Sequence, residues 1–113
     1  MGLMKLTQKN TTNIDPVMES KIVLQKIKSE LNVLQCYIFG SSVSQNFHSD
    51  SDLDLLLIFS DSADLKSVQK IIYSKRWSAL PIDFILKNKS DFDARKLIGG
   101  VCFEAFHNGI EIT

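Results

Sequence analysis

A Gly-Ser pair followed ten residues later by an Asp-Leu-Asp triplet constrains this chain more than any other feature. Gly40 and Ser41 end a largely apolar run over 33–39, whereas Asp52 and Asp54 open a second apolar run. Both runs are typical of strands, so the first is expected to lead into a tight turn. The second then begins with two carboxylates on one face. A glycine turn can approach phosphate closely, and paired carboxylates can hold a divalent metal. The layout therefore predicts handling of a nucleoside triphosphate with magnesium.

The residues around this pair of strands predict further elements. Asp15 followed by Pro16 is typical of a helix start. Apolar residues recur about every four positions from there and carry this helix to about residue 32. The next elements expected are a strand over 35–39, a short helix or turn at Gly40-Ser41, a polar loop over 45–51 and a strand over 53–59.

The second half of the sequence continues the alternation of helices and strands. Asp61-Ser62 is expected to cap a helix that runs to about residue 75, and a third strand is expected over 80–86. Ser90 is expected to cap a last helix, with Asp93 completing a capping box. Gly99-Gly100 is expected to bend or interrupt that helix, or to let it approach the sheet closely. A short terminal strand is expected over 109–112.

This order of elements, αβαβαβα, predicts a small α/β (α+β) fold in which helices pack on a mixed β-sheet. A chain of 113 residues has the mass for one modest core. Residues 16–113 are therefore expected to form a single domain, preceded by a flexible arm over 1–15.

Composition limits the compartment and the partners. Thirteen basic residues balance thirteen acidic ones, so no global positive field attracts nucleic acid. Cys36 and Cys102 lie in apolar segments without metal-ligand spacing, which indicates buried, reduced thiols in a cytoplasmic protein. We expect no secretory signal in the first ten residues and no membrane span, because the longest apolar run near the motif is too short.

The spacing of Asp52 and Asp54 indicates a metal site. Alternation along a strand places both carboxylates on one face, with Cα atoms roughly 6.5–7 Å apart. Two carboxylates this close repel each other unless a cation lies between them. Two other aspartate-rich motifs are excluded. A dehalogenase-type phosphatase has its apolar strand before the first aspartate, and an EF-hand needs glycine where this chain has Leu55.

Asp83 is the third candidate carboxylate. It lies within the apolar run over 80–86, where an unpaired buried carboxylate would cost several kcal/mol. If this strand lies beside the strand of Asp52 and Asp54, Asp83 could act as a general base and as a ligand of a second metal. The alternative is an aspartate at a strand edge that only faces water.

The Gly-Ser pair has its own chemistry. Gly40 has no Cβ, and Ser41 supplies a hydroxyl and a backbone N–H at the start of a helix, where the dipole favours anions. A Walker A loop would need Gly-Lys-Ser/Thr, which the sequence lacks.

Gly40-Ser41, the ten-residue spacing to Asp52-Leu53-Asp54 and the later Asp83 between Ile82 and Phe84 together resemble the polymerase β-type nucleotidyltransferase superfamily. Length and spacing resemble its minimal nucleotidyltransferases (MNT), including the antitoxins that partner HEPN-type RNase toxins. The resemblance covers about residues 33–113.

This resemblance implies a reaction and a set of roles. The hydroxyl of an acceptor attacks the α-phosphate of a nucleoside triphosphate, with ATP as the expected donor, and pyrophosphate leaves. Gly40, Ser41 and Ser42 would bind the triphosphate. Asp52 and Asp54 would bind two Mg²⁺ ions, and Asp83 would be the general base and a further metal ligand.

The turn departs from the family pattern. Many relatives carry Arg or Tyr after Gly-Ser, then a basic residue and Gly, whereas this chain has Ser42, Ser44 and Gln45. The missing cation could be replaced by one of three basic residues later in the chain: Lys66, Arg76 or Lys87.

Three functions are compatible with the sequence. The first is transfer of AMP to a hydroxyl of a partner protein, which the resemblance identifies as a HEPN-type toxin with this chain as its antitoxin. The second is modification of a small molecule, as in aminoglycoside nucleotidyltransferases. The third is a catalytically silent binding antitoxin or scaffold subunit. In each case the small size of the domain favours a homo- or hetero-oligomer over a solitary monomer.

Overall fold

A four-stranded mixed sheet lies at the centre of the computed structural model, which describes residues 14–44, 47 and 51–113. The strands lie in the order β3-β2-β1-β4. Their bounds are Gln35–Phe39 for β1, Leu53–Phe59 for β2, Ile82–Asn88 for β3 and Ile110–Ile112 for β4. β1 pairs antiparallel with β2 and β4, and β2 pairs parallel with β3. The predicted mixed sheet is confirmed.

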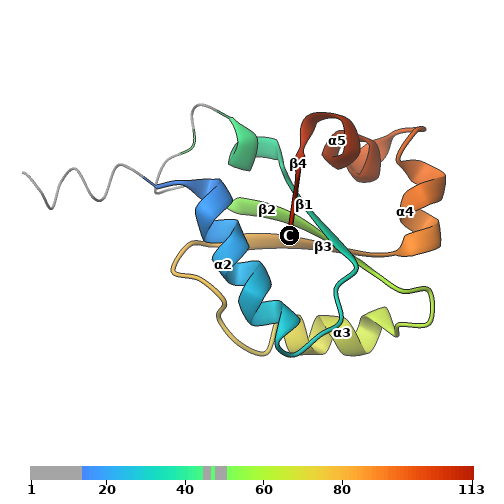
Figure 1. Cartoon of the computed structure of the whole chain (residues 1–113), viewed down its shortest axis with the longest axis horizontal. Coiled ribbons are helices and arrows are strands. Elements are labelled where there is room, and N and C mark those ends of the chain that lie inside the picture. The colour runs from blue at the N-terminus through green and yellow to red at the C-terminus, as the bar shows by residue number, and fades with distance from the viewer. Residues whose placement is uncertain (1–13, 45–46, 48–50) are drawn as a thin grey trace, which may run out of the picture.

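Helices cover both faces of this sheet (Figure 1). The helices are α2 (Pro16–Lys28), α3 (Leu65–Ile72), α4 (Lys89–Arg95) and α5 (Gly100–Asn108), with the 3-10 helix η1 (Gly40–Val43) directly after β1. β2 and β3 are parallel because α3 carries the chain back across the sheet between them. Figure 1 shows η1 at the end where β2 and β3 begin, while α4 lies at the end where β3 finishes.

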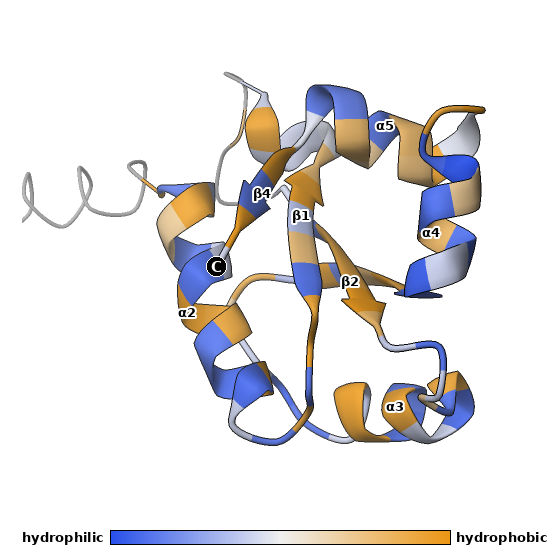
Figure 2. Cartoon of the chain, turned by 45° about the vertical axis from the view of Figure 1, so that its right-hand side comes forward, coloured by the Kyte–Doolittle hydropathy of each residue, from blue (hydrophilic) through white to orange (hydrophobic). Residues whose placement is uncertain are grey.

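Alternation along the central strand divides the core in two. Leu53, Leu55 and Leu57 are fully buried on one face of the strand, as predicted for Leu53 and Leu55, and Leu55 and Leu57 join the core cluster that includes residues of α2 and α3. Leu56 and Ile58 are buried on the other face, against Phe92 of α4 and residues of α5. Figure 2 shows β1 and β2 as largely hydrophobic, whereas α2 alternates hydrophobic and hydrophilic residues. Both faces of β2 are therefore apolar along most of its length, and its polar residues gather at its start.

Helix α2 begins as predicted and ends earlier. The Asp15 carboxylate accepts hydrogen bonds from the N–H groups of Val17 and Met18 at 3.0 and 3.3 Å. The helix ends at Lys28 rather than near residue 32 because the Ser29 hydroxyl donates to the Lys26 carbonyl at 2.6 Å. This side-chain bond takes up one of the last helical carbonyls.

The predicted caps of the later helices are wrong. The N-cap of α3 is Asp64 instead of Asp61 or Ser62, and its carboxylate accepts from the Lys66 N–H at 3.1 Å. Asp61 instead accepts from the Ser90 N–H at 2.8 Å, so the start of α4 is capped by a residue from another segment. α4 begins at Lys89, so Ser90 lies inside its first turn rather than at its cap.

Three boundaries also moved. α3 ends at Ile72 instead of about residue 75, and β3 spans Ile82–Asn88 instead of 80–86. The expected interruption of the last helix at Gly99-Gly100 is confirmed: the segment is divided into α4 and α5, with Gly100 at φ +78°. A Cβ at either glycine would meet nothing within 4 Å, so no close approach explains the interruption.

Of the remaining sequence predictions, some are confirmed and others concern residues outside the described part of the chain. Cys36 and Cys102 are buried free thiols, and burial raises the pKa of Cys36 to about 12. The arm over 1–13, Gln45 and most of the loop over 45–51 lie outside the described residues. None of the helices in the described part of the chain combines the length and the hydropathy needed to cross a bilayer.

Candidate functional site

The carboxylates predicted from the sequence meet at one end of the sheet. Asp54 lies opposite Phe39, the last residue of β1, and opposite Asp83 of the parallel strand β3. The condition set for Asp83, that its strand lies beside the strand of Asp52 and Asp54, is therefore met. The site is where η1 begins and where β2 and β3 start (Figure 1).

The three aspartates differ in exposure. Asp52 and Asp83 are exposed, and Asp54 is half-buried between its neighbouring strands. Strand alternation puts Asp54 on the face opposite Leu53 and Leu55, and the register puts Asp83 on the same face as Asp54. Asp54 is therefore the inner carboxylate of the site, and the other two are accessible from solvent.

Gly40 lies against the inner carboxylate. Its φ is +62°, a left-handed conformation that residues with a Cβ rarely adopt. A Cβ built at Gly40 would lie 2.6 Å from Asp54 Oδ2, closer than real Cβ atoms approach their neighbours. The left-handed turn therefore favours glycine, and a Cβ there would also displace the end of the Asp54 side chain. The sequence predicted closeness to phosphate, and the structure adds closeness to Asp54.

Two serines of η1 hold the start of β2 in place. The exposed Ser41 hydroxyl donates to the Asp52 carbonyl at 3.2 Å and to Asp54 Oδ2 at 3.4 Å. The Ser42 hydroxyl is buried and accepts from the Asp54 N–H at 2.8 Å. The Ser41 hydroxyl therefore lies where it can donate a hydrogen bond to an anion or to a carboxylate. Ser42 instead faces inward and positions Asp54. Ser42 was expected to bind the triphosphate together with Ser41, and no sequence pattern distinguished its inward orientation.

Electrostatics at the site set Asp54 apart. Burial raises the pKa of the Asp54 carboxyl above its ordinary value, and the neighbouring charges of Asp83 and Asp52 raise it further. Hydrogen bonds from Ser41 act in the opposite direction and lower the same pKa. The raised pKa reflects burial first and the neighbouring negative charges second, and no ion pair within the described residues balances these charges.

This chemistry fits a hard divalent cation. The available donors are carboxylate oxygens, which Mg²⁺ prefers, and the Gly40 turn leaves the space beside Asp54 that a side chain would otherwise fill. In residues 14–44, 47 and 51–113, no three His, Cys, Asp or Glu side chains are already arranged closely enough to hold an ion. Magnesium commonly completes its shell with substrate phosphates and water, so a pair of carboxylates is a sufficient protein contribution.

None of the three candidate replacement cations forms an ion pair with the carboxylates within the described residues. Lys66 is in the first turn of α3 and Lys87 lies opposite Ile58, both at the far end of β2 and β3 from Asp54. Arg76 lies on the segment that leads into β3, where its guanidinium donates to the carbonyls of Ser78 and Ala79 at 3.0 and 3.1 Å. The charge of Arg76 is therefore directed toward its own loop.

The fold and the carboxylate site define a nucleotidyltransferase-type protein, and comparison with known proteins assigns the family. Residues 21–113 match the family described as Polymerase beta, Nucleotidyltransferase. The chain therefore belongs to the polymerase beta nucleotidyltransferase family.

One solved structure supports the fold. It is the crystal structure of a presumed nucleotidyltransferase from Sulfolobus solfataricus, which is 22% identical to this chain. The match covers 69% of this chain and 71% of that one, with a TM-score of 0.52. No curated protein matches the chain significantly. At this identity the structural likeness bears on the fold alone.

Proposed function

We propose that this chain is a Mg²⁺-dependent nucleotidyltransferase that transfers a nucleoside monophosphate, AMP from ATP in the first instance, to a hydroxyl of a partner protein. The observation that carries the proposal is the register that sets Asp54 directly opposite Asp83, with the Gly40 backbone against the Asp54 carboxylate. Membership of the nucleotidyltransferase family supports the reaction class.

Each site residue has a role in this proposal. Asp52 and Asp54 would hold Mg²⁺, and Asp83 would contribute to a second ion. Bound there, the metal would neutralise charge on the triphosphate and on the leaving pyrophosphate. Gly40 and Ser41 would receive the triphosphate, because the turn has no side chain at Gly40 and an exposed hydroxyl at Ser41. Ser42 would act indirectly, by fixing the Asp54 backbone.

The chemical step is an in-line displacement at the α-phosphorus. The acceptor oxygen forms a bond to that phosphorus while the bond to the pyrophosphate oxygen breaks. Asp83 accepts the proton of the attacking hydroxyl, which its exposure permits. Asp54, whose pKa is raised, would have to be ionised to hold the metal. Activity is therefore expected to fall as pH drops toward the Asp54 pKa.

The acceptor and the biological role follow from the resemblance. We assign the acceptor hydroxyl to a tyrosine or a similar residue of a HEPN-type RNase toxin. The chain would then act as the antitoxin of that pair.

Co-expression with a HEPN-type partner, followed by intact-mass spectrometry of the partner, tests the proposal. Wild type is expected to add one or more nucleotide units, and the mass increment identifies the nucleotide. Asp52→Asn should leave the partner unmodified. Asp91→Asn, which changes the same charge on α4, should transfer as wild type does. A stable complex without any increment would instead support a silent antitoxin. Pyrophosphate release with an aminoglycoside in place of the partner would support small-molecule modification.

A further inference from the structure

β3 is an edge strand, and within residues 14–44, 47 and 51–113 no strand pairs with its outer side. It is the terminal strand in the order β3-β2-β1-β4 and has seven residues, whereas β4 at the other edge has three. A long open edge presents unpaired N–H and C=O groups and is usually protected. β3 is therefore the place where the sheet could accept another strand.

The register identifies which residues of β3 face outward. Leu53 lies opposite Ile82, yet its N–H donates to the Pro81 carbonyl at 2.9 Å. In a parallel pair a residue bonds to the two neighbours of its partner, so alternate residues from Pro81 onward turn their backbone groups toward β2. The residues between them direct their backbone N–H and C=O groups to the free edge: Ile82, Phe84 and Leu86.

Tyr73 covers this edge only loosely. Its hydroxyl donates to the Phe84 carbonyl at 3.5 Å, the outer limit of a hydrogen bond, and its ring meets Phe84 edge to face at 6.0 Å. Tyr73 is still 58% exposed. A single long hydrogen bond to an exposed side chain can be exchanged for a better one at little cost.

Two grooves meet at Tyr73 and Phe84 and together follow the whole edge. One has a volume of about 350 Å³ and reaches the Trp77–Ile82 segment, and the other has about 340 Å³ and lies between α3 and β3. Their charged lining residues are all basic: Lys66, Lys75, Arg76 and Lys87. In a chain of zero net charge, four cations and no lining carboxylate form a local excess.

Half of this positive charge is unmatched. Lys75 pairs with Glu30, and Lys87 lies 3.5 Å from Asp91. Lys66 and Arg76 have no ion-pair partner within the described residues, and Arg76 donates only to backbone carbonyls. Charge complementarity therefore favours an acidic occupant. The open backbone groups favour an extended peptide over a nucleic acid, because only a peptide strand continues the ladder of N–H and C=O groups.

We propose that the β3 edge is a docking site for an extended acidic segment of a partner polypeptide, which adds to the sheet as a fifth strand. Neighbouring strands lie about 4.8 Å apart, so side chains of such a segment would lie one strand width from Asp83. This last point rests on the proposed function, because it would bring an acceptor hydroxyl to the general base. The docking itself does not depend on transfer.

Binding of a labelled peptide tests the docking without nucleotide or metal. The probe is an eight-residue peptide of glutamate and valine around one tyrosine, followed by fluorescence anisotropy and by the backbone amide shifts of the protein. Saturable binding with shifts concentrated on residues 82–86 is expected. Two N-methylated forms of the peptide, one blocking each edge of its backbone, separate strand addition from loose contact. One form should lose binding and the other should keep it.

Matched variants on one helix test the charge. Lys66→Glu is expected to weaken peptide binding about three- to tenfold at low salt, since it removes one attraction and adds a repulsion. Lys70→Glu makes the same change one turn later on α3, outside both grooves, and should leave binding unchanged. Arg76→Gln, which keeps hydrogen-bond donors, should weaken binding in the same direction as Lys66→Glu.

Several results would overturn the docking proposal. Both N-methylated peptides could bind equally well, or Lys66→Glu and Lys70→Glu could weaken peptide binding equally. The peptide could also fail to bind at all, whether or not the nucleic-acid control, an eight-nucleotide oligo(dT), binds. A concentration-dependent dimer that protects residues 82–86 would also overturn it, by assigning the edge to a second copy. Asp52→Asn should bind the peptide as wild type does, so failure of the transferase proposal would leave this result standing.

Discussion

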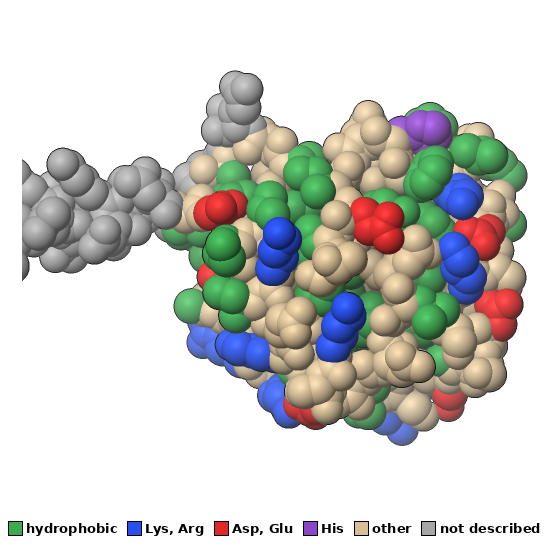
Figure 3. Space-filling view, in the orientation of Figure 1, with side chains coloured by type: hydrophobic (Ala, Val, Ile, Leu, Met, Phe, Trp, Pro, Cys, Tyr) green, Lys and Arg blue, Asp and Glu red, His purple; other side chains and the backbone are tan. Residues whose placement is uncertain are grey.

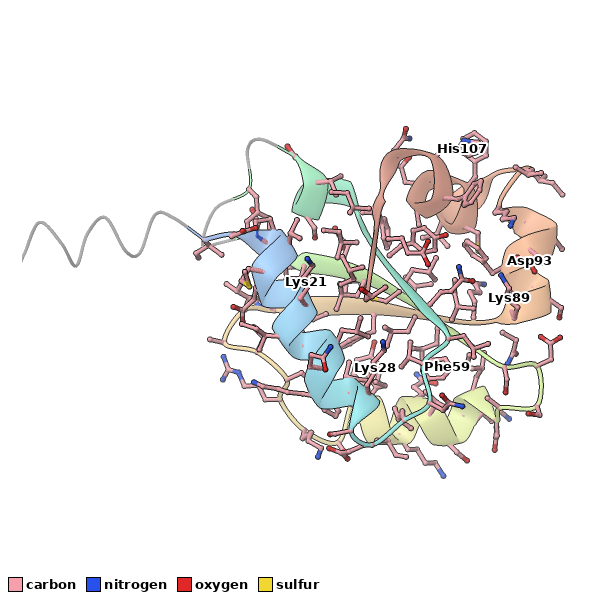
Figure 4. The ribbon with its side chains drawn as sticks, viewed as in Figure 1. Lys21, Lys28, Phe59, Lys89, Asp93 and His107 are labelled. Atoms are coloured by element: carbon pink, nitrogen blue, oxygen red, sulfur yellow. The ribbon has the colours of Figure 1, made fainter. Side chains whose placement is uncertain are left out.

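The two ends of the sheet hold aspartates in opposite electrostatic states. At the start of β2, burial and the charges of Asp83 and Asp52 raise the pKa of Asp54. At the other end, on α4, hydrogen bonds from Arg95 and Lys89 lower the pKa of Asp91 and of Asp93 respectively. Figure 4 shows Lys89 and Asp93 together on α4, at the opposite end of the molecule from η1.

The cations explain the difference. Each α4 aspartate has two of them, with Arg95 and Lys87 at 2.7 and 3.5 Å from Asp91, and Lys89 and Lys96 at 3.0 and 3.3 Å from Asp93. Basic and acidic side chains alternate over this end in Figure 3. Within the described residues no ion pair reaches Asp52, Asp54 or Asp83.

This contrast separates aspartates that stabilise the fold from aspartates that are available for chemistry. On α4 the protein supplies the positive charge itself, within one helical turn. At the start of β2 it gathers negative charge, and no ion pair within the described residues balances it. Three variants and one set of solution conditions test this difference.

The largest effect is expected from neutralising the inner carboxylate. Asp54→Asn should reduce nucleotide transfer about a hundredfold or more, because metal stabilisation of the displaced charge supplies several kcal/mol. The readout is the rate of pyrophosphate release. Asp93→Asn on α4 is the matched control and should leave this rate unchanged. Equal losses in the two variants would show that the carboxylate end has no special role.

Gly40→Ala is expected to destabilise the fold. The left-handed backbone costs a residue with a Cβ about 1–2 kcal/mol, before the clash with Asp54 Oδ2 is counted. Denaturant unfolding measures the free energy. Gly99→Ala is the control, since its φ of 162° is extended backbone and its Cβ would meet nothing within 4 Å. Similar losses in both variants would contradict the packing of Gly40 on Asp54.

Ser42→Ala is expected to destabilise the fold by about 1–3 kcal/mol, because it leaves the N–H of Asp54 without its buried acceptor. Transfer should fall with it, since Asp54 would no longer be fixed. Ser62→Ala removes an exposed hydroxyl and should change the free energy of unfolding by less than about 0.5 kcal/mol. If the denaturation midpoint of Ser42→Ala equals that of wild type, the Ser42 hydroxyl does not stabilise the start of β2.

The smallest effects are those of pH and metal on stability, and their signs are opposite at the two ends. The raised pKa of Asp54 means that its ionisation opposes folding. Its penalty therefore grows as pH rises from the ordinary value of 3.8 through the raised pKa. The lowered pKa of Asp91 means that its contribution is present above 3.8 and is lost as pH falls through that lowered value.

Thermal unfolding at neutral pH without metal distinguishes these signs. Asp54→Asn should raise the Tm, and Asp91→Asn should lower it slightly, as expected for exposed pairs. Added Mg²⁺ should raise the Tm of wild type, because binding at ten times its Kd adds about 1.4 kcal/mol to the free energy of unfolding. Mg²⁺ should raise the Tm of Asp54→Asn less. A Tm loss in Asp54→Asn without metal would contradict the uncompensated charge at this end.

Local sequence patterns were sufficient for several elements. The Asp15-Pro16 pair predicted the start of α2, and the apolar run after Asp54 predicted β2 with both bounds, because caps and alternation depend on near neighbours. Where a cap depended on a distant residue, prediction failed. Asp61 was predicted to start the next helix, yet it caps the start of α4, 29 residues later.

Residue types and the period of a strand were enough to predict the available chemistry: a Gly-Ser turn, two same-face aspartates at one strand and a third aspartate in a later strand. The pairing of Asp83 with Asp54, the inward orientation of Ser42 and the position of Lys66 and Lys87 at the far end depend on how the chain folds. Register between distant strands is set by the packing of both sheet faces and by the α3 crossover, which no local pattern encodes.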